Sequence, residues 1–368
     1  MILGIYSYLC ACHVKVIDER AAKPLLDPAS VNPLEISRAR TILYMELSLQ
    51  CIEAELHLFR EKFEQSLRTN VPLADNVIRY FLDRRGKQLR PIMTLLSAKM
   101  LRGEVSASTI NGAVAVELLH NASLMHDDVI DASDERRGKE TINRVWDNHV
   151  AVLMGDFFLA KCLSCSSDTG SLEIIRALTR MTMALTEGEL SQMSNARSHM
   201  LSEEAYFSVI EGKTASLFAA CLQIGALSVN ASADEVAQMG EIGKKFGLIF
   251  QIRDDIFDYF PTNDSVGKPT GHDILEGKVT LPLLYALQHG PSDEAQRMRD
   301  VLFSSSVLSN EDALALVEFA RQVGGIEYAQ ACMKKISFDV KQQLSCFPAN
   351  ECRAALMSLV DYIIDRKG

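Results

Sequence analysis

Hydrophobic residues recur at steps of three and four positions through most of the chain, which is the spacing of one face of an α-helix. Leu47, Cys51, Ala54 and Leu58 show the pattern in the first long block. The blocks cover residues 36–68, 88–101, 108–126, 148–165, 172–194, 203–229, 233–260, 279–288, 311–323, 325–345 and 350–365. Glycine and proline separate them, and no alternating β-branched run with hairpin turns is found. The pattern predicts an all-α fold, a single-domain bundle of about ten or more helices.

The first 33 residues do not share this pattern. Pro24, Pro28 and Pro33 indicate a loop-like segment, and the first 17 residues are apolar without the basic start of a secretory signal. We interpret residues 1–33 as a dispensable extension and residues 34–368 as the functional domain. A weak signal peptide, a targeting remnant and an upstream translation start are the alternatives. No apolar run reaches the ~18 residues of a membrane span, so we expect no transmembrane segment.

Charge and cysteine content narrow the class of protein. The formal net charge is −10, and an acidic chain repels nucleic acid, although a local basic pocket can still bind phosphate. The nine cysteines form no regular framework. Cys162 and Cys165 make one C-x-x-C without a second pair at zinc spacing, which favours a structural role on a helix. Together the cysteines indicate reduced thiols and a cytoplasmic location.

Two D-D-x-x-D clusters end strongly apolar helical blocks, the first after 108–126 and the second within 233–260. On a helix, positions four apart share a face, so Asp127 lies above Asp131 and Asp254 above Asp258. Paired carboxylates repel each other and oppose the helix dipole, and a divalent cation removes both penalties. Oxygen ligands without histidine or cysteine at ligand spacing favour Mg²⁺ over zinc. A solvated acidic turn remains the alternative for one cluster, but it explains two poorly.

Basic residues lie close to both clusters. They are Lys87 and Arg90 in G-K-Q-L-R-P, Arg136 and Arg137 after the first cluster, and Lys268 and Lys278 after the second. Arginine holds phosphate oxygens bidentately, and lysine supplies a compact charge. His120 lies two helical turns before Asp127 and is therefore on a related face. Each residue alone is more often a solvated charge or a core histidine, but the set favours a phosphate ligand.

In this order, the motifs resemble the trans polyprenyl diphosphate synthases over about residues 40–365. They are G-K-x-x-R-P, L-L-H-N-A-S-L-M-H-D-D-V-I-D, E-R-R-G-K, M-G-D-F-F, G-K-T-A-S-L-F, F-Q-I-R-D-D-I-F-D and G-H-D-I-L-E-G-K-V-T-L-P. The resemblance implies an isoprenoid-synthase fold around a central cavity, and a homodimer. It also implies two substrates, isopentenyl diphosphate and an allylic diphosphate. One departure is Arg85, which stands where the family usually has a glycine before Gly86 and affects the expected geometry at Lys87.

The resemblance also implies a role for each matching residue. Isopentenyl diphosphate would be bound by Lys87, Arg90, His120 and Arg137. About three Mg²⁺ ions would be held by Asp127, Asp131 and Asp254, supported by Asp128, Asp255 and Asp258. The allylic diphosphate would contact Arg136, Lys213, Lys268 and Lys278. Thr214 and Gln251 would stabilise the allylic carbocation through their dipoles, and the departing diphosphate would accept the proton.

Product length is expected to depend on the helix before the first cluster. In the family a bulky aromatic residue four or five positions before the first aspartate stops elongation, whereas this chain has Ser123 and Ala122 there, followed one turn deeper by Leu119. Each helical turn adds ~5 Å of depth. We therefore expect a C30–C50 product of the quinone side-chain type, made from a farnesyl or geranylgeranyl starter. A short-chain C15–C20 synthase is the alternative.

Three other functions compete with this one. A class I terpene cyclase ionises similar substrates, but it usually pairs one D-D-x-x-D with a different second motif and lacks the G-K-x-x-R site. A non-catalytic subunit of a heteromeric synthase typically loses one aspartate cluster, and both are intact here. A purely structural helical protein leaves the clustered charges unexplained. Release of the product through peripheral contact with a membrane is compatible with the sequence.

Overall fold

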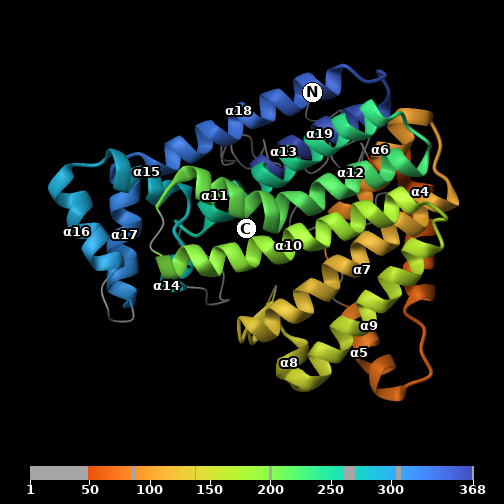
Figure 1. Ribbon diagram of the computed structural model, residues 1–368, viewed down its shortest axis with the longest axis horizontal. Helices are drawn as coiled ribbons and strands as arrows, with labels where there is room; N and C mark the ends of the chain where they lie inside the picture. Colours follow the sequence, from red (N-terminus) through yellow and green to blue (C-terminus); the bar gives the residue numbers. More distant parts are fainter. Residues whose placement is uncertain are drawn as a thin grey trace, which may run out of the picture.

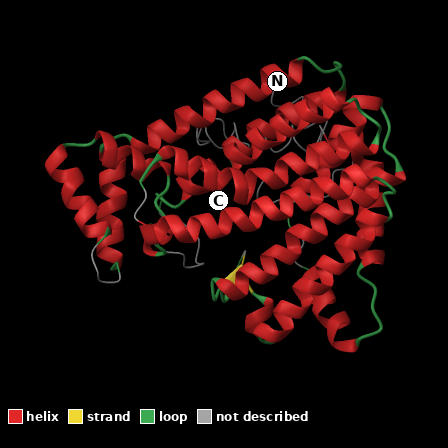
Figure 2. Cartoon of the chain, viewed as in Figure 1, coloured by secondary structure: helices red, strands yellow, loops and turns green. Residues whose placement is uncertain are grey.

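Helices make up most of the described chain, which in this computed structural model comprises residues 49–83, 86, 88–136, 138–198, 201–260, 270–303 and 308–366 (Figure 2). One antiparallel pair, β1 (Glu135–Arg136) and β2 (Lys139–Glu140), is the strand structure in these ranges. The predicted all-α fold is confirmed. The extension predicted for residues 1–33 lies outside the described residues, and its boundary stays a prediction.

The helices follow one another with short connections. In chain order they are η2 (Gln50–Ile52, 3-10), α4 (Glu53–Ser66), α5 (Pro72–Leu82), α6 (Leu89–Arg102), α7 (Ala107–Ile130), α8 (Ile142–Val145), α9 (Asn148–Ser167), α10 (Leu172–Ser198), α11 (Glu203–Ile210), η3 (Glu211–Ala215, π), α12 (Ser216–Ser228), α13 (Ala233–Phe257), α14 (His272–Leu275), α15 (Leu281–His289), α16 (Ser292–Leu302), α17 (Asn310–Gln322), α18 (Gly325–Ser345) and α19 (Glu351–Asp365).

Some of these helices differ from the predicted blocks. α5 was not predicted, because it is short and its first helical residue is Pro72, a position that tolerates proline. α16 is mainly polar, and its buried face consists of Ala295, Met298 and Leu302. The predicted block 203–229 is divided, because a five-residue π-helix separates α11 from α12.

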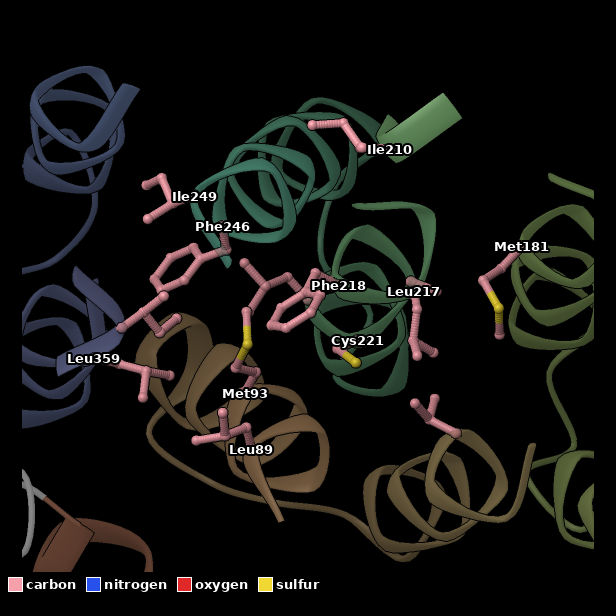
Figure 3. Packing of buried hydrophobic residues seen from close by; sticks show 14 of the residues in the cluster. Leu89, Met93, Met181, Ile210, Leu217, Phe218, Cys221, Phe246, Ile249 and Leu359 are labelled. Carbon is pink, nitrogen blue, oxygen red and sulfur yellow. The ribbon is translucent and has the colours of Figure 1, made fainter. Parts of the chain in front are cut away.

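α12 is the centre of the fold and packs against α6, α7, α10 and α13. Its sequence is apolar on nearly every side, so the helix is stable only when surrounded. Figure 3 shows Phe218 and Cys221 of α12 beside Met93 of α6, with Phe246 of α13 and Leu359 of α19 in the same layer. All five residues are buried. In Figure 1 the long helices α7, α10, α12 and α13 run along the length of the molecule.

The helices that carry the two acidic clusters begin close to the predicted positions, and α7 extends about one turn beyond its predicted block. Ser106 begins α7 with a capping box, and α7 ends with Asp131 as its C-cap. Ser232 begins α13 in the same way, and Asp258 is its C-cap. Both clusters therefore occupy a last helical turn, where the helix dipole disfavours negative charge.

α9 is the helix that bears on the expectation of no transmembrane segment. Within the described residues it is the one helix whose length and hydropathy suffice, with a mean hydropathy of 1.4 over its most apolar window. Core helices of soluble proteins also pass this test, and α9 packs along α7. Only 39% of that window is buried, and Leu153 and Leu163 are exposed.

Candidate active site

A cavity of about 920 Å³ lies between α7, α10, α11, η3, α13 and the segment that leads into α15. Residues of both acidic clusters line it, Asp127 and Asp131 from α7 and Asp255 from α13. Lys213 and Lys278 also form part of its wall. Two regions that are distant in the sequence therefore meet around one space.

The three aspartates of the first cluster have different surroundings. Asp127 and Asp131 line the cavity, as their helical spacing predicts. Burial raises the pKa of Asp127 to about 6, and the negative charge of Glu189 acts in the same direction. Asp128 instead accepts a 2.7 Å hydrogen bond from Nε of Arg136 in β1. The ion pair with Arg136 thus holds Asp128 in place, and Asp127 and Asp131 face the space where a ligand would bind.

The second cluster is oriented differently from the prediction. Asp255 lines the cavity, while Asp254 and Asp258 do not belong to the described wall. Asp254 is 2.5 Å from Nη2 of Arg366, just after α19. Asp258 accepts the backbone N–H groups of the first turn of α14, at 3.0 and 3.1 Å. These partners hold Asp254 and Asp258, so the residue beside Asp254 faces the ligand space.

Asp255 anchors a chain of four hydrogen-bonded side chains. Its carboxylate accepts bonds from the Tyr206 hydroxyl at 2.6 Å and from Nε2 of Gln251 at 2.7 Å. Oε1 of Gln251 in turn accepts the Thr214 hydroxyl at 2.7 Å. Burial raises the pKa of Asp255 to about 7, and the charge of Asp273 adds to this effect. The network fixes the orientation of Gln251 and Thr214, both of which line the cavity.

Lys213 and Thr214 lie in the π-helix η3, a rare geometry often found at functional sites. Glycine makes this arrangement possible, since a Cβ at Gly188 of α10 would lie 2.6 Å from the Lys213 backbone nitrogen. The close approach brings Glu189 to 2.7 Å and Gln192 to 3.2 Å from Nζ of Lys213. Lys213 is thus held over the cavity by two residues of α10.

The other predicted basic residues have varied positions. Lys278 lines the cavity and lies 2.6 Å from Glu276. Burial alone would lower its pKa, but Glu276 and the neighbouring acidic residues raise it. Arg90 and His120 are not part of the described wall; Arg90 lies 5.5 Å from the centre of the Phe218 ring, and His120 is buried. Lys87, Arg137 and Lys268 lie outside the described residues.

The inner part of the cavity is apolar. Ala122, Ser123 and Leu119 of α7 line it, so the three residues predicted to control product length do face the ligand space. The opposite side is formed by residues of α9, α10 and α11, namely Leu159, Met181, Leu185 and Ile210. The space therefore combines a charged region with an apolar one.

Several residues that contact the predicted charged groups of this region were not themselves predicted from the sequence. They include Glu189, Gln192, Tyr206, Asp273, Glu276 and Arg366. Asp273 and Glu276 could have been found, because both are part of the motif G-H-D-I-L-E-G-K. The other four lie on α10, on the short helix α11 or just after α19, where periodicity does not reveal which polar residue turns inward.

The donor set of the cavity suits a hard divalent cation. Its described wall contains six carboxylates and two lysines; the carboxylates are Asp127, Asp131, Glu189, Asp255, Asp273 and Glu276. No group of three or more histidine, cysteine, aspartate or glutamate residues within the described ranges is close enough to form a complete metal site. Mg²⁺ commonly uses one or two carboxylates and completes its shell with water and substrate phosphate. The excess of acidic oxygen therefore fits Mg²⁺ bound together with a phosphate ligand.

Comparison with known proteins gives consistent matches. The family model described as "Polyprenyl synthetase" matches residues 71–317. An octaprenyl diphosphate synthase of Haemophilus influenzae is 33% identical over 300 residues, covering 82% of this chain and 90% of its own length. A polyprenyl synthase of Caulobacter crescentus, solved with calcium and isoprenyl diphosphate, aligns with a TM-score of 0.81 and 30% identity over 88% of this chain and 98% of its own. A geranylgeranyl pyrophosphate synthase of Bacteroides thetaiotaomicron aligns with a TM-score of 0.75 and 40% identity over 88% and 99%.

Proposed function

The chain belongs to the polyprenyl synthetase family, and from this premise we propose that it joins isopentenyl diphosphate to a growing allylic diphosphate. The observation that carries the proposal is the meeting of Asp127 and Asp255 in one cavity that also holds Lys213 and Lys278. The arrangement combines sites for metal and diphosphate with an apolar space for a prenyl chain.

The proposed cofactor is Mg²⁺, about three ions per site. Asp127, Asp131 and a residue of the second cluster, Asp254 or Asp255, would hold them. When bound, the metal would neutralise the diphosphate and favour its departure as a leaving group. The Caulobacter relative, solved with calcium and isoprenyl diphosphate, supports dependence on a divalent metal.

The cavity lysines would hold the allylic diphosphate. Lys213 and Lys278 each lie within 2.7 Å of a glutamate, Glu189 and Glu276 respectively. Phosphate oxygens can replace the glutamate oxygens in such pairs, because they accept the same charge-assisted hydrogen bonds. Arg136 is fixed by Asp128 and would meet the same diphosphate from β1, as the resemblance implies.

Thr214 and Gln251 would act on the reacting carbons. Their hydrogen bond and the one from Gln251 to Asp255 fix two side-chain oxygens in the cavity wall. Oxygen atoms held in place near a developing allylic cation stabilise it without reorganisation during the reaction. The apolar walls around Ala122 and Leu159 would keep water from quenching that cation.

The proposed product is a long trans-polyprenyl diphosphate of C30–C50, suited to a quinone side chain. The small residues Ala122 and Ser123 in the cavity wall support it, and so does the octaprenyl diphosphate synthase relative. A C20 product is the second candidate, because the geranylgeranyl pyrophosphate synthase is 40% identical. Both candidates share the same chemistry and differ in the depth of the apolar space.

We also propose that two copies associate in the cytoplasm. α9 and α10 expose large apolar side chains, including Leu153 at 66% and Leu163 at 61% on α9 and Leu172 and Met183 on α10. A second copy is the occupant that the resemblance implies for such a face. Light scattering after gel filtration should give twice the chain mass, and a monomer at micromolar concentration would contradict the proposal.

One assay tests the proposed reaction. Labelled isopentenyl diphosphate and farnesyl diphosphate are incubated with the protein, with Mg²⁺ or with a chelator, and the extracted product is chromatographed. We expect Mg²⁺-dependent products that are mainly C30 or longer. Mainly C20 would select the second candidate, a cyclic hydrocarbon would indicate a terpene cyclase, and no condensation would overturn the proposal.

A further inference from the structure

Two cysteines from opposite ends of the described chain place their sulfur atoms in contact. Cys352 and Cys51 are 301 positions apart, yet the two Sγ atoms are 3.5 Å from each other, with the Cys352 thiol donating. A disulfide bond measures ~2.05 Å, so this is a contact between thiols that needs a small shift to become a bond. Neither residue is part of the cavity wall described above.

Packing fixes this contact. Cys51 lies in η2 next to Ile52, which is fully buried, and Cys352 lies in the first turn of α19. Asn350 caps α19 by accepting the Arg353 N–H at 3.0 Å, and its side-chain amide donates to the Met100 carbonyl at 2.9 Å. α6 packs against both η2 and α19. The sulfur atoms thus belong to two elements held on one common helix.

The two sulfur atoms differ in acidity. The hydrogen bond from Cys352 lowers the pKa of Cys51, and the positive charge of Lys99 acts in the same direction against burial and nearby carboxylates. Lys99 forms an ion pair with Glu55, one helical turn after Cys51. Donating that bond raises the pKa of Cys352 far above its usual range. Cys51 is partly exposed and Cys352 is buried, so an outside reagent reaches Cys51 first.

We propose that Cys51 and Cys352 form a thiol–disulfide exchange site that accepts a small disulfide such as oxidised glutathione. The Cys51 thiolate attacks one sulfur of the reagent, forming a mixed disulfide and releasing one thiol. The Cys352 sulfur then attacks Cys51, its proton goes to solvent, and the second thiol leaves. In total, two protein thiols and one small disulfide give one protein disulfide and two small thiols.

The bond would link the beginning of the described helices to the last helix. Its closed loop of about 300 residues is long, and long loops lose the most chain entropy when they are cross-linked in the unfolded state. The oxidised protein should therefore resist unfolding better than the reduced one. In a reducing compartment the two cysteines remain thiols, and a shift to oxidising conditions forms the disulfide bond.

Peptide mapping of the full chain tests the site. Trypsin would release Cys51 in peptide 41–60 and Cys352 in peptide 342–353, which also contains the exposed Cys346. A Cys346→Ser background removes this ambiguity. The protein is equilibrated with glutathione from fully reduced to fully oxidised, alkylated and digested. We expect a linked pair of these peptides, lighter by two hydrogens, that vanishes in the Cys346→Ser, Cys352→Ser protein.

Thermal unfolding gives an independent readout. In the Cys346→Ser protein, oxidation should raise Tm by roughly 3–8 °C. The additional Cys352→Ser change keeps side-chain size and should remove that rise while leaving the reduced Tm within about 2 °C. Separate alkylation of both cysteines in fully oxidised glutathione would overturn the proposal. So would a lasting glutathione adduct on Cys51 without the linked peptide.

Discussion

The guanidinium of Arg366 lies 2.5 Å from a carboxylate oxygen of Asp254, so the end of the last helix contacts the first residue of the second acidic cluster. The same guanidinium is stacked 3.9 Å above the Phe250 ring centre, and the Arg366 carbonyl accepts two hydrogen bonds from Arg253. These contacts join the chain end to α13. They also explain why Asp255, and not Asp254, faces the cavity.

Replacing Arg366 should destabilise the protein. Arg366→Gln would leave Asp254 without its ion pair and remove the stacked guanidinium, at a cost of about 1–3 kcal/mol in the free energy of unfolding. Urea denaturation measures it. The matched control is Lys341→Gln, which breaks the more exposed Lys341–Asp361 pair and should cost under ~0.5 kcal/mol. Equal losses in the free energy of unfolding for the two variants would show that the Arg366–Asp254 contact contributes no more than an exposed ion pair.

The buried carboxyl groups predict an unusual pH dependence in the metal-free protein. The pKa of Asp127 is about 6 and that of Asp255 about 7, both above the unfolded value near 3.8, chiefly through burial. Between pH 4 and 7 the folded state therefore binds more protons, so these groups lower stability as pH rises. With a chelator present, Tm should fall from pH 5 to 7.5.

Metal should reverse this trend. Mg²⁺ with inorganic pyrophosphate stabilises the charged carboxylates, so Tm at pH 7.5 should rise with ligand concentration. Asp255→Asn should flatten the pH slope of the metal-free protein. A slope unchanged by Asp255→Asn would mean that other groups cause it.

Tyr206→Phe should slow the reaction. The change removes the hydroxyl that holds Asp255 at 2.6 Å, and losing a hydrogen bond to a charged group costs about 1.5–3 kcal/mol, a drop of roughly 10- to 100-fold in kcat/KM. The control is Tyr328→Phe, whose hydroxyl donates to Glu203 at 3.0 Å outside the cavity wall. It should stay within about twofold of the parent. A parent-like Tyr206→Phe enzyme would contradict the role of the network.

Filling the apolar part of the cavity should shorten the product. Ala122→Phe places an aromatic ring in the wall where the chain grows, so elongation should stop earlier. Chromatography of the product measures its length. Leu314→Phe, at an exposed position of α17 outside the cavity wall, is the matched control and should leave the length unchanged. An Ala122→Phe enzyme with the parent's product would show that the chain does not grow past α7.

Lys213→Gln tests the diphosphate site. Loss of its charge should raise KM for the allylic diphosphate at least about tenfold, since charge-assisted bonds to phosphate are strong. Lys244→Gln is the control, because Lys244 pairs with Glu211 of the same π-helix but lies outside the cavity wall. Similar KM values for both variants would remove Lys213 from substrate binding.

The sequence revealed the helical class, the acidic clusters and the small residues at 122 and 123, because each depends on local spacing. Helical periodicity places Asp127 and Asp131 on one face, and the structure agrees. Periodicity does not reveal the role of Arg366, because its contact with Asp254 depends on where α19 packs. It does not reveal Glu189 either, because the approach of Glu189 to Lys213 depends on Gly188 and on the π-helix. Long-range packing determined the features that spacing could not.

The central claim is that the two acidic clusters hold metal and diphosphate together in one cavity. Anomalous diffraction from crystals grown with Mn²⁺ and an unreactive allylic diphosphate analogue tests it most directly. We predict metal peaks coordinated by Asp127 and by the second cluster, with the same diphosphate bridging them. Metal bound at only one cluster, or the analogue bound elsewhere on the protein, would contradict the account.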